Sequence, residues 1–206
     1  LNKGLKGKYI AVIGKNCYEW VLSYLAASTV GVAVPLDKES GVEDISRFIN
    51  EAGCSLICYH EDCLSKVCSD KETLSFSTVR EICEAETPID YHAVSSIVPS
   101  RDEMKVLLFT SGTTGGSKGV CLSQHNILSN IYSTVSMVKI KDSDTVLSIL
   151  PLHHTYELAV MIAALSLGAT VCINDSLKYV LRNFKEFKPT GLVLVPLFVN
   201  TMYKKI

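Results

Sequence analysis

The chain has 206 residues, of which 48% are hydrophobic and 20% are charged, and its formal net charge is −1. This composition supplies enough apolar material for a folded core and excludes an intrinsically disordered chain. The nearly balanced charge argues against nucleic acid as the main partner, because binding to a phosphate backbone relies on clustered Lys and Arg.

Two apolar runs, Val21 to Leu36 and Leu158 to Ile173, raise the question of membrane insertion. Both are shorter than about 20 continuous apolar residues, and Gly31 and Gly168 divide each run into a helix-like and a strand-like half. We therefore predict buried core and no transmembrane segment. The start of the chain has no adequate apolar region for a signal peptide, and because it opens on Leu we expect the true N-terminus elsewhere.

The chain contains eight cysteines, and four of them lie close together around His60: Cys54, Cys58, Cys63 and Cys68. Their spacings lack the paired C-x2-C of zinc and iron–sulfur sites, so we predict no metal. Reduced thiols are typical of a cytoplasmic protein, which is the location we expect. Cys121 and Cys172 stand in apolar runs and are expected to behave as small hydrophobes.

The first elements read as a βαβ unit. Tyr9 to Ile13 is a β-rich run, and the helix predicted over Cys17 to Val30 is apolar nearly all round and therefore buried. Gly31 stops that helix, and the strand Val32 to Val34 follows and is closed by Pro35. Two strands joined by one helix within about thirty residues imply a parallel sheet.

Asn16 and Glu19 are predicted to cap the first helix reciprocally. An amphipathic helix follows over Gly41 to Ala52, and then a strand over Ser55 to Tyr59. From His60 to Arg101 the pattern weakens into short polar pieces, and no chemistry can be assigned there.

A strand over Val106 to Phe109 leads directly into TSGTTGGSKG, residues 110–119, which combine hydroxyls, four glycines and Lys118 with no acid. Glycine lets a ligand approach the backbone closely. Successive N–H groups in such a loop bind anions, and Lys adds a full positive charge. We therefore predict a polyphosphate site. A Gly/Ser/Thr-rich surface linker is the alternative, but linkers lack a preceding buried strand.

This loop does not fit the Walker A pattern. Counting from Gly112, Ser117 stands where that pattern requires glycine, and Gly119 stands where it requires Ser or Thr. Residues 119–122 read as another short strand, so the loop joins two strands before a helix begins near Gln124.

A second motif, LPLHHTYE at 150–157, follows a strand predicted over Asp144 to Leu150. His153 and His154 would stand at a strand end, where open α/β sheets bind ligands. On spacing alone, a solvated turn with two ordinary histidines remains the favoured interpretation.

The rest of the chain continues the α/β alternation. Helices are predicted over Gln124 to Val138, Leu158 to Leu167 and Ser176 to Phe187, the last with Leu177, Val180, Leu181, Phe184 and Phe187 on one side. Strands are predicted over Ala169 to Ile173 and Gly191 to Val195.

The loop resembles the phosphate loop of the adenylate-forming enzymes: acyl-CoA synthetases, luciferases and the adenylation domains of peptide synthetases. Residues 109–115 and 118–120 match its signature, and Asn126 matches beyond it. Ser117 replaces the usual proline and Gln124 the usual histidine. Other matching positions, which the resemblance makes structural, are Asn16, Glu19, Trp20, Gly31, Pro35, Leu36 and Asp37.

The resemblance implies an α/β fold with a mostly parallel sheet flanked by helices, of which residues 1–206 form a partial N-terminal AMP-binding (adenylation) domain with the C-terminal remainder absent. It makes Lys118 and His154 candidate catalytic residues, because the matching histidine lies by the acyl and adenylate site. A glutamate at the position of Glu157 is commoner in the long-chain fatty acyl-CoA synthetases than in the amino-acid-activating branch of the family. The nucleotide-binding residues that it implies are Thr110, Ser111, Gly112, Thr113, Thr114, Gly115 and Lys118.

The implied activity of the parent is ligation of a fatty acid to coenzyme A, using ATP and Mg²⁺ whose ligand lies outside these residues. The 206 residues alone are expected to be inactive. Two alternatives stay open: adenylation of an amino or aryl acid, and a non-catalytic domain that binds nucleotide or a partner. Contact of the parent with a membrane surface also stays open.

Overall fold

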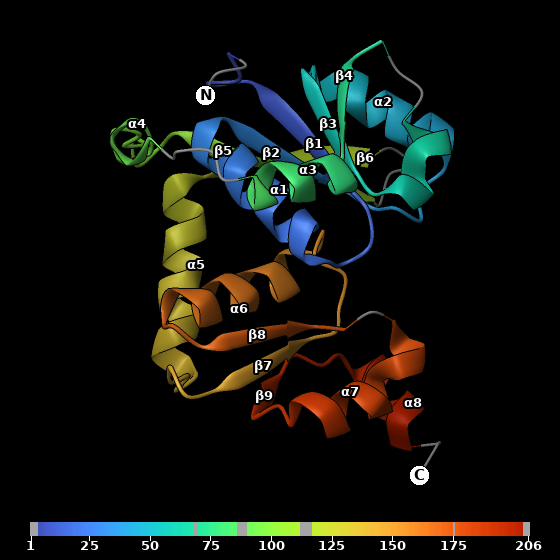
Figure 1. The fold of residues 1–206 in the computed structure, drawn as a ribbon, viewed down its shortest axis with the longest axis vertical. Helices are drawn as coiled ribbons and strands as arrows, with labels where there is room; N and C mark the ends of the chain where they lie inside the picture. Colours follow the sequence, from blue (N-terminus) through green and yellow to red (C-terminus); the bar gives the residue numbers. More distant parts are fainter. Residues whose placement is uncertain (1–3, 68–69, 86–89, 112–116, 175, 204–206) are drawn as a thin grey trace. The chain divides into compact units, whose positions relative to one another are not determined.

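The computed structural model describes residues 4–67, 70–85, 90–111, 117–174 and 176–203. The chain divides into two compact units, Leu1–Ile127 and Leu128–Ile206, and each unit is built around its own sheet (Figure 1).

The first unit contains a six-stranded sheet in the order β4-β3-β1-β2-β5-β6. All neighbouring strands are parallel except β5 and β6, which are antiparallel. This mostly parallel sheet confirms the predicted fold class. The strands are β1 Tyr9–Ile13, β2 Val32–Leu36, β3 Leu56–Tyr59, β4 Glu72–Ser75, β5 Met104–Ser111 and β6 Ser117–Ser123.

Helices lie on both faces of this sheet (Figure 1). α1 (Tyr18–Val30) and α3 (Phe76–Glu84) pack together, and α2 (Val42–Ala52) buries Ile45, Phe48 and Ile49 in a cluster with Ala11 and Ile13 of β1. The crossover β1-α1-β2 moves along the sheet in one direction, and β2-α2-β3 moves back in the opposite direction past β1. Because such connections are right-handed, their helices lie on opposite faces of the sheet. The segment η1 (Glu61–Lys66) and the short helix α4 (Tyr91–Ser95) complete the unit.

The predicted cap of the first helix is wrong. Cys17, not Asn16, occupies the N-cap of α1, and no side-chain cap hydrogen bond is made there. Glu19 is instead only 4% exposed and accepts a hydrogen bond from Arg80 Nε at 2.7 Å. An ion pair with a distant helix therefore replaces the local capping interaction.

Pro35 does not close the second strand, because β2 continues through it to Leu36. A proline has no N–H to donate, so it is tolerated only where the ladder does not require one. In the described structure, β2 pairs with β5 at Ala33 and Val106, and Ala33 lies two residues before the proline. Gly31 ends α1 as predicted.

The weakly patterned stretch after His60 holds regular structure that was not predicted. It contributes η1, the edge strand β4 and the helix α3, whose Phe76 and Val79 are buried. β4 has exposed and half-buried residues only, so it lacks the apolar alternation by which strands are recognised.

The second unit contains a three-stranded parallel sheet in the order β8-β7-β9. One core cluster joins Val146 to Ala164 of α6, and the other joins Leu147 to Val180 of α7, so successive residues of β7 point to opposite faces. The elements are α5 Gln124–Met137, β7 Thr145–Ser148, α6 Thr155–Ser166, β8 Thr170–Ile173, η2 Leu177–Tyr179, α7 Val180–Phe187, β9 Gly191–Leu192 and α8 Pro196–Tyr203.

Several details differ from the prediction. The amphipathic stretch is divided between η2 and α7, and Leu181 is 57% exposed rather than on the buried side. The last strand ends at Leu192. Cys172 is half-buried, and in the first unit Cys121 is exposed because β6 is the edge strand of its sheet.

Candidate functional site

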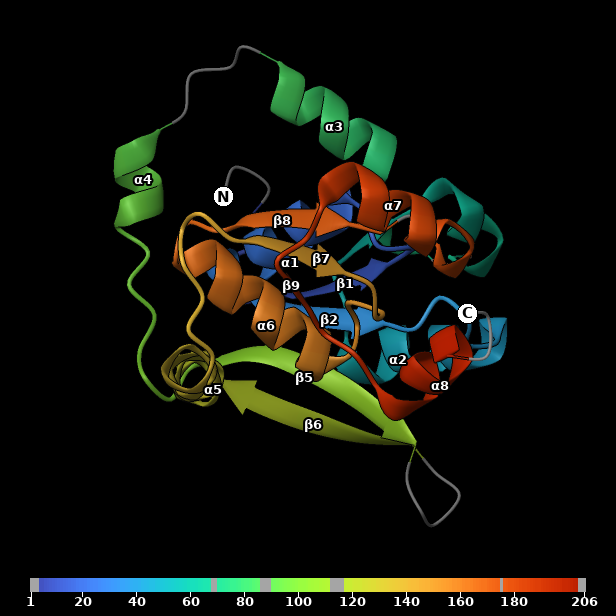
Figure 2. The same cartoon turned by 90° about the horizontal axis from the view of Figure 1, so that it is seen from below.

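The antiparallel pair β5 and β6 brings the two ends of the predicted phosphate loop together. Thr110 lies opposite Lys118 and Ser111 lies opposite Ser117 in the register of this hairpin. Figure 2 shows the two strands side by side along the edge of the sheet. The hydroxyl of Thr110 also donates a hydrogen bond to the carbonyl of Lys118 at 3.5 Å. The sequence prediction that the loop joins two strands is therefore confirmed.

The remaining loop residues of the prediction, Gly112, Thr113, Thr114 and Gly115, lie outside the described residues. Their roles stay predictions. The described residues show that Ser111 and Ser117 lie opposite each other in the hairpin.

Aromatic packing anchors the hairpin to α2. The ring of Phe109 stacks on that of Phe48, with centroids 4.3 Å apart and planes inclined by 18°. Gly119 faces Phe109 across the hairpin, and a Cβ at this position would lie 3.2 Å from Leu107 Cδ1. A larger residue would therefore crowd the side chains that hold the loop-bearing strand in the core.

The hairpin from Met104 to Ser123 carries positive charge and no acid. Lys105 is 1% exposed, and its amine donates to Glu103 Oε1 at 2.7 Å, which lowers the pKa of Glu103. Lys118 is exposed, and among the described residues its amine has no ion-pair partner. The charge of Lys118 is thus available to an anionic ligand, whereas that of Lys105 is already used in the fold.

Asn126, which matches the family signature beyond the loop, lies in the first turn of α5 and bonds reciprocally with Ser123, which caps the helix. Its Oδ1 accepts hydrogen bonds from the backbone N–H of Ser123 at 2.9 Å and from the Ser123 hydroxyl at 3.0 Å. The N–H of Asn126 in turn donates to Ser123 Oγ at 3.3 Å. This reciprocal arrangement joins β6 directly to the following helix.

His154 belongs to the second unit, where it is the exposed N-cap residue of α6. Its N–H donates to the Pro151 carbonyl at 3.1 Å, and its ring lies 4.1 Å from that of His153 between centroids. The segment follows the carboxyl end of β7. β8 and β9 pair with opposite sides of β7, so β7-α6-β8 runs to one side of β7 and β8-α7-β9 crosses to the other. His154 therefore stands at a topological switch point, where open α/β sheets bind ligands.

Glu157 lies in the first turn of α6 and is buried, although the neighbouring Thr155 and Tyr156 are exposed. It is 1% exposed, and its Oε1 accepts a hydrogen bond from the Ile149 N–H at 3.2 Å. Burial raises the pKa of Glu157, and the neighbouring Ser148 side chain and the backbone of Leu150 and Ile149 lower it by less. The carboxyl group thus connects the first turn of α6 to the end of β7.

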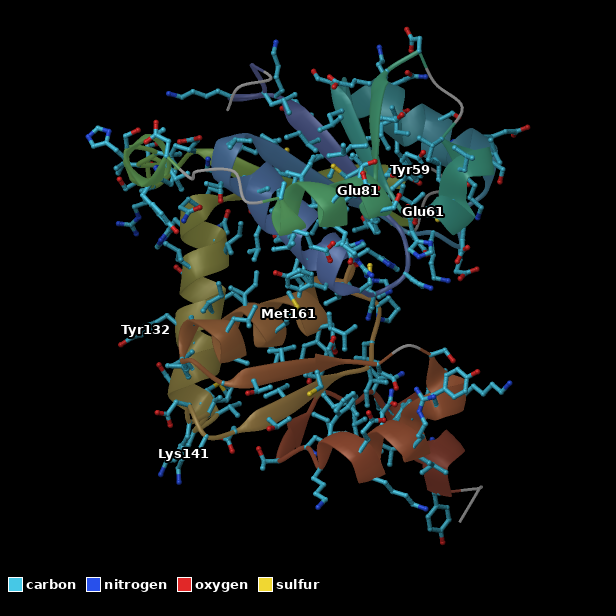
Figure 3. The ribbon with its side chains drawn as sticks, in the orientation of Figure 1. Tyr59, Glu61, Glu81, Tyr132, Lys141 and Met161 are labelled. Atoms are coloured by element: carbon cyan, nitrogen blue, oxygen red, sulfur yellow. The ribbon has the colours of Figure 1, made fainter. Side chains whose placement is uncertain are left out.

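The first unit has its own switch point, between β1 and β3, and a cavity of about 390 Å³ lies there. Its lining comes from the segments after these strands and from α3: Lys15, Cys17, Glu19, His60, Glu61, Phe76, Ser77, Arg80, Glu81 and Glu84. Glu61 and Glu81 are labelled in Figure 3. Sequence reasoning missed this cavity, because no pattern in the chain marks the pairing of Glu19 with Arg80.

The protein's own carboxylates occupy the positions in this cavity where an anion would bind. Glu19 stands in the first turn of α1, and Glu61 Oε1 accepts the N–H of Ser77, in the first turn of α3, at 2.8 Å. Burial alone would raise the pKa of Glu61, but hydrogen bonds from the Ser77 backbone and hydroxyl outweigh it and lower the pKa to about 2. The start of α3 is therefore satisfied internally, and Glu19 places a negative charge at the start of α1, so a polyphosphate is unfavourable there.

The described cysteines of the first unit are free thiols, and burial raises the pKa of Cys54 to about 12 and that of Cys58 to about 11. Within the described ranges, no three His, Cys, Asp or Glu side chains converge as metal ligands would. No helix among the described residues combines the length and apolarity that a membrane crossing requires.

The family model described as AMP-binding enzyme matches residues 1–205. Long-chain-fatty-acid–CoA ligase 5 of Rattus norvegicus is 29% identical over 241 residues, covering 100% of this chain and 35% of the relative. Long chain acyl-CoA synthetase 2 of Arabidopsis thaliana is 28% identical over 230 residues, covering 97% of this chain and 35% of the relative. The structure of o-succinylbenzoate coenzyme A synthetase from Bacillus subtilis in complex with AMP has a TM-score of 0.82 at 22% identity, over 97% of this chain and 52% of that one.

The chain therefore belongs to the AMP-binding enzyme family, as its phosphate-loop motif predicted. It spans about 35% of the length of these curated relatives, which are long-chain acyl-CoA ligases. The solved structure supports the predicted fold.

Proposed function

We propose that this chain is the phosphate-binding part of an enzyme that activates a fatty acid with ATP and then transfers the acyl group to coenzyme A. The observation that carries the proposal is the β5–β6 hairpin. It places Thr110 opposite Lys118 on either side of the glycine- and hydroxyl-rich loop, and it contains no acid.

In the proposed reaction, a carboxylate oxygen attacks the α-phosphate and the bond to the β-phosphate breaks, so negative charge grows on the pyrophosphate that leaves. Donors arranged in advance around that leaving group lower the barrier electrostatically. We assign this work to Thr110, Ser111, residues 112–115 and Lys118. His154 is assigned to orient the carboxylate or to line the acyl entrance.

Magnesium has no fitting ligand set in this hairpin, because residues 104–123 include no Asp or Glu and hard cations prefer carboxylate oxygens. No step is therefore assigned to a metal ion on these residues. Their contribution is to bind and orient phosphate oxygens through N–H, O–H and ammonium donors.

The long-chain branch is supported by the curated relatives, which are long-chain ligases at 28% and 29% identity, and by Glu157 after the His154 motif. A different carboxylic acid substrate, amino or aryl, is the second candidate within the same chemistry. A domain that binds nucleotide or a partner without turnover is the candidate outside it.

ATP–pyrophosphate exchange by the intact protein, measured with fatty acids of increasing length, tests the proposal. Exchange only with long acyl chains is the expected result. Lys118→Ala and Thr113→Ala should each slow adenylation more than they weaken fatty-acid binding, and unchanged rates in both variants would refute the assignment of the loop. A folded protein without exchange on any fatty acid would favour another carboxylate or the binding domain.

A further inference from the structure

Glu157 differs from the other buried charged side chains of the described chain. Glu19, at 4% exposure, is bonded to Arg80, and Lys105, at 1%, is bonded to Glu103. Glu157 is equally buried at 1%, but the ion pairs among the described residues do not include it. A carboxylate buried without a cation is strongly unfavourable, so such a group normally neutralises itself by keeping its proton.

The atoms around Glu157 indicate where that proton belongs. Oε1 accepts the N–H of Ile149 and is therefore satisfied. Oε2 is buried and has no hydrogen-bond partner among the described residues, and the same holds for the buried hydroxyl oxygen of Ser148. A proton on Oε2 would give the carboxyl a donor and Ser148 Oγ a partner, so one bond would satisfy both atoms.

We propose that Glu157 keeps its proton in the folded protein and, as a neutral carboxylic acid, is the positioning residue of the segment 149–154 that carries His154. The N–H of Ile149 donates to Oε1, and Oε2–H donates to Ser148 at the end of β7. This proposal rests on the proposed function only where it concerns catalysis.

The surrounding charges do not oppose this assignment. Among the described residues of α6, β7, β8 and the segment 149–154, the other titratable side chains are Tyr156, Cys172, His153 and His154. The charged residues between α5 and β7 lie at the other end of the unit, where a Cβ at Gly168, after α6, would meet Asp142 at 3.6 Å. Burial raises the pKa of Glu157, in contrast to Glu19, whose pKa is lowered.

The consequence for catalysis follows from the position of the bond. The carboxyl group joins the first turn of α6 to Ile149, and the chain between these two points carries His153 and His154. If this connection is lost, the His154 ring can move while the helix stays folded. A displacement of about 1 Å at a positioned group can reduce a rate by up to about 100-fold.

The test compares Glu157→Gln with Glu157→Leu in the intact protein, with Glu186→Gln on the exposed surface of α7 as the matched control. Glutamine keeps an acceptor for Ile149 and a donor for Ser148, whereas leucine keeps neither. We expect an infrared carbonyl band of a protonated carboxylic acid in wild type that Glu157→Gln removes and Glu186→Gln retains. We also expect the Tm of Glu157→Gln relative to wild type to rise with pH above about 4.5, the ordinary Glu pKa.

In ATP–pyrophosphate exchange, Glu157→Gln should stay within about twofold of wild type, and Glu157→Leu should lose tenfold or more in kcat with little change in the KM for ATP. No carboxylic acid band and a flat Tm difference would overturn the bound proton. Equal loss of kcat in both variants would overturn the positioning role. Absence of exchange in wild type would refute the proposed function alone, because the infrared band still decides the state of Glu157.

Discussion

Replacement of Gly31 by alanine tests whether the family glycine at this position is required by close packing. A Cβ at Gly31 would lie 2.2 Å from the carbonyl oxygen of Lys8, which is backbone and cannot rotate away. The same oxygen accepts the N–H of Val32 at 2.9 Å, and the N–H of Gly7 donates to the Val30 carbonyl at 2.9 Å. Gly31 has φ −153°, so the glycine is needed here for space and not for a left-handed backbone.

The cost follows from the shift that alanine would force. An ordinary contact of a Cβ is 3.4 Å or more, so the chain before β1 and the start of β2 would have to separate by more than 1 Å. That separation adds an overpacking cost of about 1–3 kcal/mol and weakens hydrogen bonds worth about 1 kcal/mol each. We therefore expect the free energy of unfolding to fall by about 3 kcal/mol.

Urea unfolding of the intact protein followed by circular dichroism measures this loss. Gly41→Ala is the matched control, because a Cβ there meets nothing within 4 Å and φ is −64°. Its expected cost is below about 1 kcal/mol, as for a glycine lost from a helix N-cap. Equal stability of the Gly31 and Gly41 variants would refute the argument that contact with Lys8 excludes a side chain.

Two further outcomes follow from groups whose pKa values are shifted. The pKa of Glu61 is lowered to about 2, so the stability that its carboxylate contributes is fully present above the ordinary Glu pKa of 4.5. That stability is lost as the pH falls through about 2. When Tm is measured during acid titration, Glu61→Gln should therefore lose less than wild type between these two pH values. Cys83 and Cys121 are exposed, whereas Cys54 and Cys58 are buried and have raised pKa values. Iodoacetamide at neutral pH should therefore label Cys83 and Cys121 in the native protein, and Cys54 and Cys58 only after unfolding. Labelling of Cys54 in the native protein would contradict its burial.

The βαβ unit at the start of the chain was predictable because its signals are local. Tyr9–Ile13 and α1 are apolar in runs of the right length, and Gly31 stops the helix where the pattern ends. β4 and α3 were not predictable in the same way. β4 is an edge strand without a buried residue, so its place is set by pairing with β3 and not by its own pattern.

In the candidate site, too, features with a local sequence signal were predictable and features set by distant contacts were not. The return of the chain from Thr110 to Lys118 was predictable, because an apolar strand stands on each side of a glycine-rich loop. The pairing of Glu19 with Arg80 joins residues 61 apart, and the sequence provides no pattern that connects them. Glu157 was visible in the sequence as part of a motif, but its burial follows only from the packing of α6 on β7.

The distribution of charge explains why the phosphate site is assigned to the hairpin and not to the cavity at the β1–β3 switch point. In the cavity, Glu19 and Glu61 already take the positions at the starts of α1 and α3, so an incoming phosphate would meet two carboxylates at the helix ends that should attract it. The hairpin lacks any acid, and Lys118 is exposed without an ion-pair partner among the described residues. Because like charges repel and a free ammonium attracts phosphate, electrostatics favours the hairpin over the cavity.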